Sequence, residues 1–204
     1  AEVVGMPLRP EIVHLDRAAL RAEAATAFGL DADRPVLLVF GGSLGAVRIN
    51  RALADAWQDI VASGWQILHA VGERNDVAEP GDDAYRTVPY IDRMDLAFAL
   101  ADAIVSRSGA ATVSEISALA IPAVYVPYAV GNGEQALNAA SAVAAGAAVL
   151  IPDGELTGDR IRSTVVPLLS DPATLDRMRG AASTVGTRSG SENVLGLIDR
   201  ALAR

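Results

Sequence analysis

Hydrophobic positions along this chain follow two alternating patterns. Short, mostly apolar runs recur along its length, and such runs are typical of strands that are covered on both faces of a sheet. Between these runs, apolar residues recur every three or four positions, which predicts helices with one buried face. The predicted strands cover residues 36–40, 65–71, 85–88, 103–106, 121–127 and 147–151, and a further strand-like piece opens the chain.

The predicted helices lie between these strands and after the last of them. Gly29 ends the first helix, and Asp92 is the expected N-cap of the third. The helices cover residues 17–28, 47–62, 94–101, a segment with Ile116 and Leu119 on its apolar face, 134–144, 157–170, 172–185 and 192–203. Regular strand–helix alternation predicts one α/β domain, a doubly wound, Rossmann-like and mainly parallel sheet with helices on both faces.

The composition agrees with this architecture and excludes several kinds of site. Apolar residues make up 51% of the 204 residues and charged residues 21%, which is typical of a globular domain. The chain has no cysteine, so a disulfide framework and a zinc–thiolate site are excluded. Its two histidines, His14 and His69, are far apart in the sequence, and no pattern of metal ligands is present.

The net charge, the length of the apolar runs and the first residues indicate what the chain binds and whether it is part of a longer protein. The formal charge of −8 argues against nucleic acid as a partner, although an acidic protein can still bind a small anionic ligand in a local pocket. No apolar run reaches the roughly 20 residues that a membrane span needs. The first residues lack an initiator Met and the regions of a signal peptide, so we expect a fragment of a longer chain.

The segment Arg107–Glu115 carries the strongest indication of a ligand. A predicted strand ends in the turn Ser108–Gly109, and a helix then begins. Small residues at such a turn allow a ligand to approach the free N–H groups of the first helical turn, which favour an anion. Glu115 lies about one turn further on, where its carboxylate could accept hydrogen bonds from sugar hydroxyls. Alternatively, Thr112 and Glu115 form a capping box and bind nothing.

Four other segments place groups that could contact a ligand in the same region of the predicted fold. Gly41–Ala46 is a glycine-rich turn with Ser43 as a hydroxyl donor, but it matches neither the dinucleotide fingerprint nor the P-loop. Tyr90, Ile91 and Met94 could line an apolar slot for a base. Glu134 and Gln135 begin a helix and suit sugar hydroxyls, and Arg9, between two prolines, could present its guanidinium to an anion. Most of these groups follow strands, whose carboxyl ends bind ligands in this architecture, so together they predict a nucleotide-type ligand.

Five segments together resemble the MurG family, the peptidoglycan UDP-N-acetylglucosamine (UDP-GlcNAc) transferases. These segments are Gly5–Arg9, Gly41–Ala46, Tyr90–Met94, Arg107–Glu115 and Gly131–Asn138, and the last two are the most specific. The resemblance covers nearly the whole chain, in a form similar to that of high-GC Gram-positive bacteria. It implies the C-terminal, donor-binding half of a two-domain GT-B glycosyltransferase over residues 1–204, with the N-terminal acceptor and membrane domain absent.

The resemblance also implies a role for individual residues. The backbone at Ile91 would read the uracil edge, and Glu115 would hold the ribose hydroxyls. Ser43 and the helix start at Ala110, Ala111 and Thr112 would receive the diphosphate, and Val113 and Ser114 belong to the same donor-binding segment. Glu134 and Gln135 would contact the hydroxyls of GlcNAc, while Arg9 would close over the donor. Two departures from the family pattern, Leu44 and Glu134, bear on sugar selectivity.

The activity implied by the resemblance is an inverting, metal-independent transfer without a cofactor. GlcNAc would pass from UDP-GlcNAc to undecaprenyl-pyrophosphoryl-MurNAc-pentapeptide, converting lipid I to lipid II. No catalytic residue is expected in this half, because the general base and the membrane surface would belong to the N-terminal domain. The implied location is the cytoplasm, with the full-length protein peripheral on the plasma membrane.

Three alternatives remain open at the level of the sequence. Another GT-B enzyme could use a different UDP-sugar or acceptor while keeping a segment like Arg107–Glu115. A UDP-GlcNAc epimerase would share the fold, but it needs catalytic carboxylates and histidines that the sequence does not place. A plain Rossmann-like domain or non-catalytic binding module would use its glycine turns only structurally. Binding of UDP, or its absence, separates the last interpretation from the others.

Overall fold

A computed structural model describes residues 2–42, 45–75, 77, 80–128 and 132–203 of the chain. Its centre is a six-stranded parallel sheet with the strand order β3-β2-β1-β4-β5-β6. The strands are β1 (Val36–Phe40), β2 (Gln66–Ala70), β3 (Tyr85–Val88), β4 (Ala103–Ser106), β5 (Ala123–Tyr125) and β6 (Ala148–Leu150). The order reverses between β1 and β4, and this is the point at which ligands bind in doubly wound sheets.

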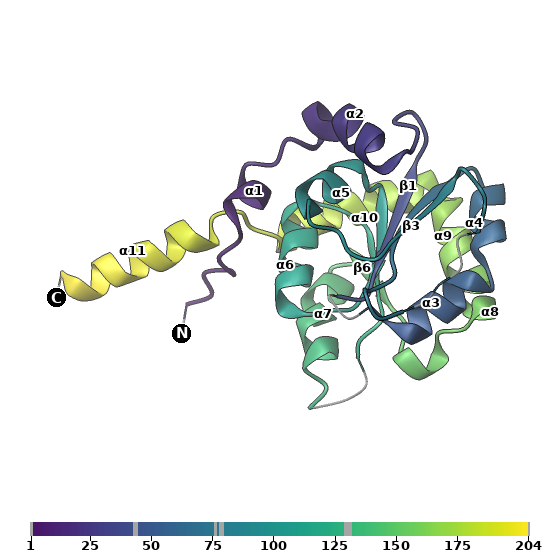
Figure 1. Cartoon of the computed structure of the whole chain (residues 1–204). Coiled ribbons are helices and arrows are strands. Elements are labelled where there is room, and N and C mark those ends of the chain that lie inside the picture. Colours follow the sequence, from purple (N-terminus) through teal and green to yellow (C-terminus); the bar gives the residue numbers. More distant parts are fainter. Residues whose placement is uncertain (1, 43–44, 76, 78–79, 129–131, 204) are drawn as a thin grey trace.

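Helices cover both faces of this sheet (Figure 1). The α-helices are α1 (Pro10–Val13), α2 (Arg17–Phe28), α3 (Val47–Ala54), α4 (Trp57–Ala62), α5 (Met94–Leu100), α6 (Ala110–Ala118), α7 (Glu134–Ala144), α8 (Gly158–Arg160), α9 (Val166–Leu169), α10 (Pro172–Val185) and α11 (Gly190–Leu202). Two further turns are the 3₁₀ turn η1 (Asp153–Glu155) and the π turn η2 (Ile161–Val165).

Successive residues of the strands pack alternately into two separate hydrophobic clusters, one on each face of the sheet. On β1, Val36 and Leu38 belong to the cluster under α2, α5, α6 and α7, whereas Leu37 and Val39 belong to the cluster under α3, α4 and α9. All four side chains are at most 1% exposed. This two-sided burial explains why the strands are apolar throughout rather than alternating with polar residues.

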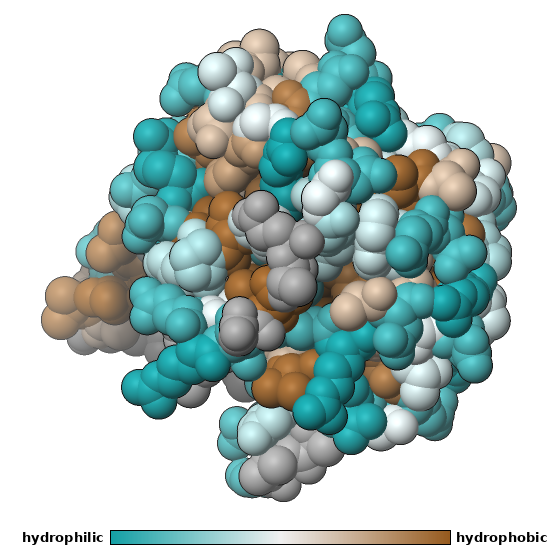
Figure 2. Space-filling model, turned by 45° about the vertical axis from the view of Figure 1, so that its right-hand side comes forward, coloured by the Kyte–Doolittle hydropathy of each residue, from teal (hydrophilic) through white to brown (hydrophobic). Residues whose placement is uncertain are grey.

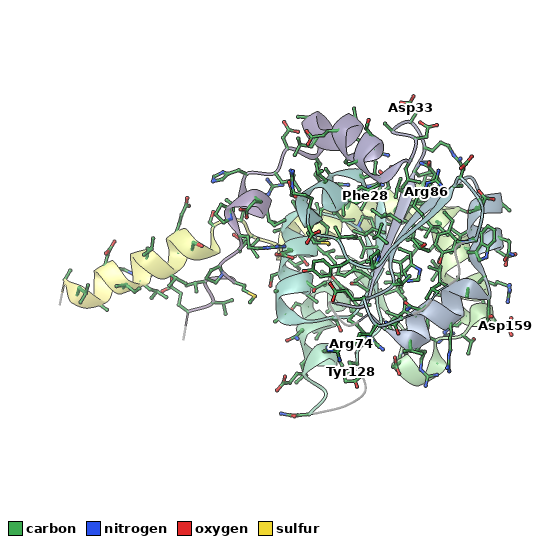
Figure 3. The ribbon with its side chains drawn as sticks, in the orientation of Figure 1. Phe28, Asp33, Arg74, Arg86, Tyr128 and Asp159 are labelled. Carbon is green, nitrogen blue, oxygen red and sulfur yellow. The ribbon has the colours of Figure 1, made fainter. Side chains whose placement is uncertain are left out.

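The loops after the strands lie along one edge of the sheet. Phe40 is in register with Ser106, and Ser106 is in register with Tyr125, so the carboxyl ends of β1, β4 and β5 are neighbours. In Figure 3, Arg74 and Tyr128, which follow β2 and β5, lie at the opposite end of the sheet from Asp33, which precedes β1. The predicted convergence of these loops is therefore confirmed.

The predicted doubly wound fold is confirmed, but two long helices are broken. The helix predicted over 47–62 ends at Ala54, because the buried Ala56 adopts φ −135° and ψ 5°, outside the helical region. The helix predicted over 157–170 passes through the π turn before α9, where Pro167 lacks the N–H of a regular helix.

Two local predictions at element ends were wrong. Asp92 is not the N-cap of α5; Arg93 occupies that position without a side-chain cap and pairs with Asp95 instead. The strand-like opening of the chain forms no strand within the described residues. It runs beside α11, where the Asn193 side chain donates to the Val4 carbonyl at 2.9 Å, and Figure 1 shows α11 and the N-terminal segment extending from the body of the domain.

The face of the domain drawn in Figure 2 is mixed in character. Figure 2 shows hydrophilic residues surrounding smaller hydrophobic areas. Across the part of the chain that the structure describes, no helix combines the length and the apolar character needed to cross a membrane.

Candidate functional site

The start of α6 presents backbone donors without a side-chain cap. Gly109 is the N-cap residue, with φ −63° and ψ 149°, so Ala110, Ala111 and Thr112 form the first turn. Among the residues that the structure describes, no side-chain hydrogen bond caps this turn, which leaves its N–H groups directed to the carboxyl edge of the sheet. The capping-box alternative was wrong, because Thr112 lies three residues inside the helix rather than at its N-cap.

Glu115 instead forms an ion pair with Arg9, which is 106 residues away in the sequence. The Arg9 Nε and Nη2 atoms donate to the same Glu115 Oε1 atom at 3.0 and 2.9 Å. The Glu115 side chain is only 12% exposed, whereas that of Arg9 is 55% exposed. Glu115 Oε2 accepts no hydrogen bond from the described residues, so it is available for a ligand hydroxyl.

The predicted base slot is only partly formed. Ile91 is 5% exposed and its side chain belongs to the hydrophobic core, so a ligand could meet only its backbone. Met94 also packs against this core, whereas Tyr90 is 47% exposed. The apolar slot therefore reduces to Tyr90 and the main chain beside it, which is compatible with backbone recognition at Ile91.

The start of α7 is fixed to two neighbouring loops by Gln135. Its Oε1 atom accepts hydrogen bonds from the Tyr128 N–H at 2.9 Å and from the Ser108 N–H at 3.3 Å. Asn138, one turn on, donates to the Ser108 carbonyl at 3.1 Å, so this residue also joins helix and loop. Gln135 Nε2 makes no hydrogen bond within the described residues, and Glu134 accepts only from Asn132, at 3.2 Å.

Val113 and Ser114 complete the predicted donor-binding segment on α6. Val113 is 8% exposed and packs into the core, so its side chain is not available to a ligand, whereas Ser114 is partly exposed. Ser114 borders a small cavity of about 160 Å³ beside the N-terminal segment. The assignment of both residues to the donor site stays a prediction.

The glycine-rich loop is held tightly against the end of β2. Ser43 and Leu44 lie outside the described residues, so the predicted diphosphate contact of Ser43 stays a prediction. Gly45 has φ +71°, and a Cβ atom at this position would overlap the carbonyl oxygen of Val71. Only glycine permits this close approach without strain.

We expect Gly45→Ala to destabilise the fold by roughly 1–2 kcal/mol more than Gly64→Ala does. Gly64 has a similar positive φ of +94°, but a Cβ atom added there would have no other atom within 4 Å, so Gly64 is a matched control for backbone strain alone. Urea unfolding of both variants measures the difference. Equal losses of stability would contradict the close contact with Val71.

A buried polar network fixes α3 beneath this loop. His69 is fully buried, with its Nδ1 atom 2.8 Å from Tyr85 Oη and its Nε2 atom 3.0 Å from Asn50 Oδ1. Asn50 Nδ2 donates to the Val71 carbonyl at 2.9 Å, which assigns Asn50 Oδ1 as the acceptor of a hydrogen bond donated by His69 Nε2–H. Burial lowers the pKa of His69 to about 4 and raises that of Tyr85, so His69 is neutral at pH 7.

No local sequence pattern indicated this network. The three residues are separated by 16 and 19 positions, and each is unremarkable within its own helix or strand. Its position below the glycine-rich loop assigns His69 a structural role in holding α3. His14, by contrast, is exposed at the end of α1.

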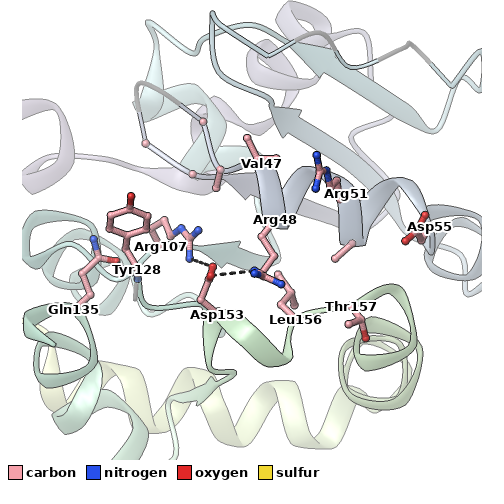
Figure 4. Close-up of a pocket in the computed structure, with 15 residues that line it drawn as sticks. Val47, Arg48, Arg51, Asp55, Arg107, Tyr128, Gln135, Asp153, Leu156 and Thr157 are labelled. Atoms are coloured by element: carbon pink, nitrogen blue, oxygen red, sulfur yellow. Dashed lines mark hydrogen bonds and ion pairs between the residues drawn. The ribbon is translucent and has the colours of Figure 1, made fainter. Parts of the chain in front are cut away.

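A larger cavity of about 820 Å³ opens beside the same loops (Figure 4). Its lining joins the glycine-rich loop and α3 to the ends of β4 and β5 and to η1. The lining residues are Gly41, Gly42, Gly45, Ala46, Val47, Arg48, Arg51, Ala52, Asp55, Arg107, Tyr128, Gln135, Asp153, Leu156 and Thr157. Of the predicted site residues that the structure describes, only Gln135 belongs to this lining.

Arg107 organises one wall of this cavity. Its Nη1 atom donates to the Val126 carbonyl at 3.0 Å and to Asp153 Oδ1 at 2.5 Å, and its guanidinium lies 5.3 Å from the centre of the Tyr128 ring. Arg48 Nε donates to the other carboxylate oxygen of Asp153 at 3.0 Å. Sequence reasoning missed Arg48 and Asp153 because their partners are 46 or more residues away.

The structure offers no metal centre within the residues it describes, since no group of three or more histidine or acidic side chains is close enough to hold an ion. The start of α6 instead offers backbone N–H groups that suit an anion. A metal-independent transfer remains a prediction.

Comparison with known proteins identifies relatives over the whole chain. A relative from Clavibacter michiganensis subsp. michiganensis is 53% identical over 203 residues, covering 100% of this chain and 55% of that protein. One from Rhodococcus jostii is 51% identical and covers 97% of this chain and 53% of that protein. Both are named UDP-N-acetylglucosamine--N-acetylmuramyl-(pentapeptide) pyrophosphoryl-undecaprenol N-acetylglucosamine transferase. The chain thus spans about half the length of the curated relatives it matches.

Solved structures agree with the fold. MurG from Acinetobacter baumannii is similar with a TM-score of 0.76 and 26% identity, covering 93% of this chain and 55% of that structure. The calicheamicin glycosyltransferase CalG4 is similar with a TM-score of 0.62, over 83% of this chain and 44% of its own, but its 24% identity shows a common fold alone. The expected fold, that of the C-terminal half of a GT-B glycosyltransferase, is confirmed.

The sequence model of one protein family accounts for most of the chain. It matches residues 36–194, from the first strand of the sheet into α11, and is described as the glycosyltransferase family 28 C-terminal domain. The match includes α6 with Glu115 and α7 with Gln135, although Arg9 lies before it. The chain therefore belongs to the glycosyltransferase family 28 C-terminal domain family.

Proposed function

We propose that residues 1–204 form the donor-binding half of an inverting glycosyltransferase that uses UDP-GlcNAc. The observation that carries this proposal is the buried Glu115 carboxylate, held by Arg9 one turn beyond the uncapped start of α6. A carboxylate beside free helical N–H groups suits a ribose next to a diphosphate. The names of relatives at about 50% identity support the same donor.

Each end of the donor has a proposed contact along the carboxyl edge of the sheet. The backbone at Ile91 would bind uracil, Glu115 Oε2 would accept from a ribose hydroxyl, and Ala110, Ala111 and Thr112 would donate N–H groups to the diphosphate. Ser43 would add a hydroxyl donor there. The unpaired Nε2 atom of Gln135 would donate a hydrogen bond to one sugar hydroxyl, and the carboxylate of Glu134 would accept one from another. Together they suit the hydroxyls of GlcNAc, since a hydroxyl both donates and accepts.

The proposed chemistry is a single displacement at the anomeric carbon of GlcNAc. The 4-hydroxyl of the N-acetylmuramyl acceptor attacks this carbon, the bond to the diphosphate breaks, and UDP leaves. The start of α6 stabilises the negative charge that develops on the leaving diphosphate, which removes the need for a metal ion. The proton of the attacking hydroxyl goes to a base outside this chain, so the 204 residues alone would bind the donor without turnover.

The acceptor and the cellular context belong to the same proposal. We place the lipid-linked acceptor, lipid I, on the missing N-terminal domain, which would also bring the full-length protein to the cytoplasmic face of the plasma membrane. Relatives that span about twice the length of this chain support a second domain. Neither a nucleic-acid partner nor a cofactor forms part of this function.

Calorimetric titration of the 204-residue chain with UDP-GlcNAc, UDP-GalNAc and UDP-glucose, without added metal, tests the proposal. We expect saturable binding that favours UDP-GlcNAc and is unchanged by EDTA. A preference for another UDP-sugar would assign the chain to a different GT-B enzyme. No binding of UDP by a cooperatively folded sample would contradict the donor-domain assignment and favour a purely structural role for the glycine turns.

A further inference from the structure

The cavity beside the glycine-rich loop extends beyond the residues that the proposed donor needs. It begins at Gln135, at the sugar end of the proposed donor, and follows α3 as far as Asp55 and Thr157 (Figure 4). Within the described part of the chain, its lining includes neither Ile91 nor Glu115, the proposed contacts of the nucleoside. Its volume of about 820 Å³ lies in the range of roughly 300–1,000 Å³ that accommodates drug-sized ligands. The cavity therefore has room for a second molecule on the side away from the nucleoside.

Two arginines of α3 could bind an anion in this extension of the cavity. Arg48 uses its Nε atom for Asp153 but has 47% of its side chain exposed, and its terminal nitrogens donate to none of the described residues. The Arg51 side chain makes no hydrogen bond or ion pair with the described residues, although its backbone carbonyl accepts from the Asp55 N–H. A guanidinium with free N–H groups matches the geometry of a carboxylate or phosphate.

The remaining charged groups of the cavity lining determine its net charge. Asp153 is already shared by Arg48 and Arg107, so its charge is compensated. Asp55 lies at the far end, with Thr157 beside it in the lining. Three arginines against two carboxylates leave a modest positive excess, together with hydrogen-bonding groups that suit a polar, extended ligand better than a compact multivalent anion.

We infer that this extension binds the peptide arm of the acceptor, with Arg48 and Arg51 receiving its C-terminal carboxylate, while the lipid and diphosphate of the acceptor stay on the N-terminal domain. The inference rests on the proposed function, because it takes the acceptor to be an N-acetylmuramyl-pentapeptide. Muramic acid carries its peptide on the oxygen at C3, next to the C4 hydroxyl that attacks the donor sugar. The diphosphate is at C1, across the ring. Of the acceptor's two anionic parts, the peptide therefore starts closer to the sugar end of the donor at Gln135.

The test uses the 204-residue chain and soluble N-acetylmuramyl-pentapeptide, titrated with and without saturating UDP and followed by NMR chemical shifts. We expect the double variant Arg48→Ala/Arg51→Ala to bind this peptide at least about tenfold more weakly, equivalent to roughly 1.4 kcal/mol. Its affinity for UDP should be unchanged. Arg34→Ala is the control for each of the two substitutions made singly, because it removes one arginine charge at the opposite edge of the sheet, before β1.

A second probe identifies the part of the acceptor that the arginines bind. An analogue with an amidated C-terminus should bind the unmodified chain as weakly as the acid binds the double variant. Equal binding of the acid to the unmodified chain and the double variant would overturn the inference. So would inorganic pyrophosphate displacing the peptide at lower concentration, which would assign the arginines to the diphosphate. Failure of the proposed function would show separately, as loss of UDP binding by the unmodified chain.

Discussion

Replacing Glu115 with Ala will weaken the binding of UDP by about 1–3 kcal/mol, or roughly 5- to 150-fold in Kd. The carboxylate is 12% exposed and its Oε1 atom is occupied by Arg9, so Oε2 is the atom proposed to accept from the ribose. Loss of this charged acceptor leaves the ribose hydroxyls without a partner in a partly buried site. Isothermal titration with UDP and with uracil measures the effect, and only UDP should be affected.

Glu192→Ala is the control for this experiment, because Glu192 is an exposed carboxylate in the first turn of α11. It removes the same charge from the chain and should leave UDP affinity unchanged. Thermal unfolding must show that Glu115→Ala remains folded. If a folded Glu115→Ala variant binds UDP as tightly as the unmodified chain, Glu115 serves only as the partner of Arg9.

Acidification from pH 6.5 to pH 4 will destabilise the fold by about 3 kcal/mol through His69 alone. Burial lowers the pKa of this histidine from 6.5 to about 4. Between these two values the unfolded chain takes up a proton that the folded chain excludes, so the free energy of unfolding falls as the pH falls. The contribution is fully present above pH 6.5 and is lost as the pH approaches 4. Urea unfolding at several pH values measures this slope.

Two variants assign the slope to a particular histidine. His69→Gln should be less stable at pH 7, because it disturbs the bonds to Asn50 and Tyr85, but it should lose the dependence on pH across this window. His14→Gln should keep that dependence, since His14 is exposed. The assignment would be refuted by a full slope in His69→Gln or by its disappearance in His14→Gln.

The sequence by itself determined the order of strands and helices. The bounds of β1, β3 and β4 and of α2 and α10 match those predicted, because local hydrophobic runs and helix-terminating residues define them. β5 is shorter than predicted and comprises only Ala123–Tyr125, since its length depends on pairing with β4 and β6. Strand–helix alternation was sufficient for the doubly wound fold, because parallel strands need helical crossovers.

Sequence patterns also located the loops of the candidate site but not their contacts. They indicated Arg9 and Glu115 separately, each from its neighbours in the chain. That Arg9 bonds Glu115 across 106 residues, and that Gln135 Oε1 bridges Ser108 and Tyr128, depends on loops brought together by the sheet. The diphosphate contacts, including Ser43, stay predictions.

Only the tertiary structure decided which polar residues are buried and which line the cavity. His69 joins Asn50 and Tyr85 because α3 packs over β2 and β3, and Arg48 meets Asp153 because η1 returns to the same edge of the sheet. The hydrophobic spacing within one element cannot predict such pairs, because the two residues of a pair belong to different elements. Each residue also fits the polar and apolar pattern of its own helix, strand or turn. Hydrophobic spacing therefore determined the architecture, while hydrogen bonds and ion pairs between distant segments determined the shape and charge of the site.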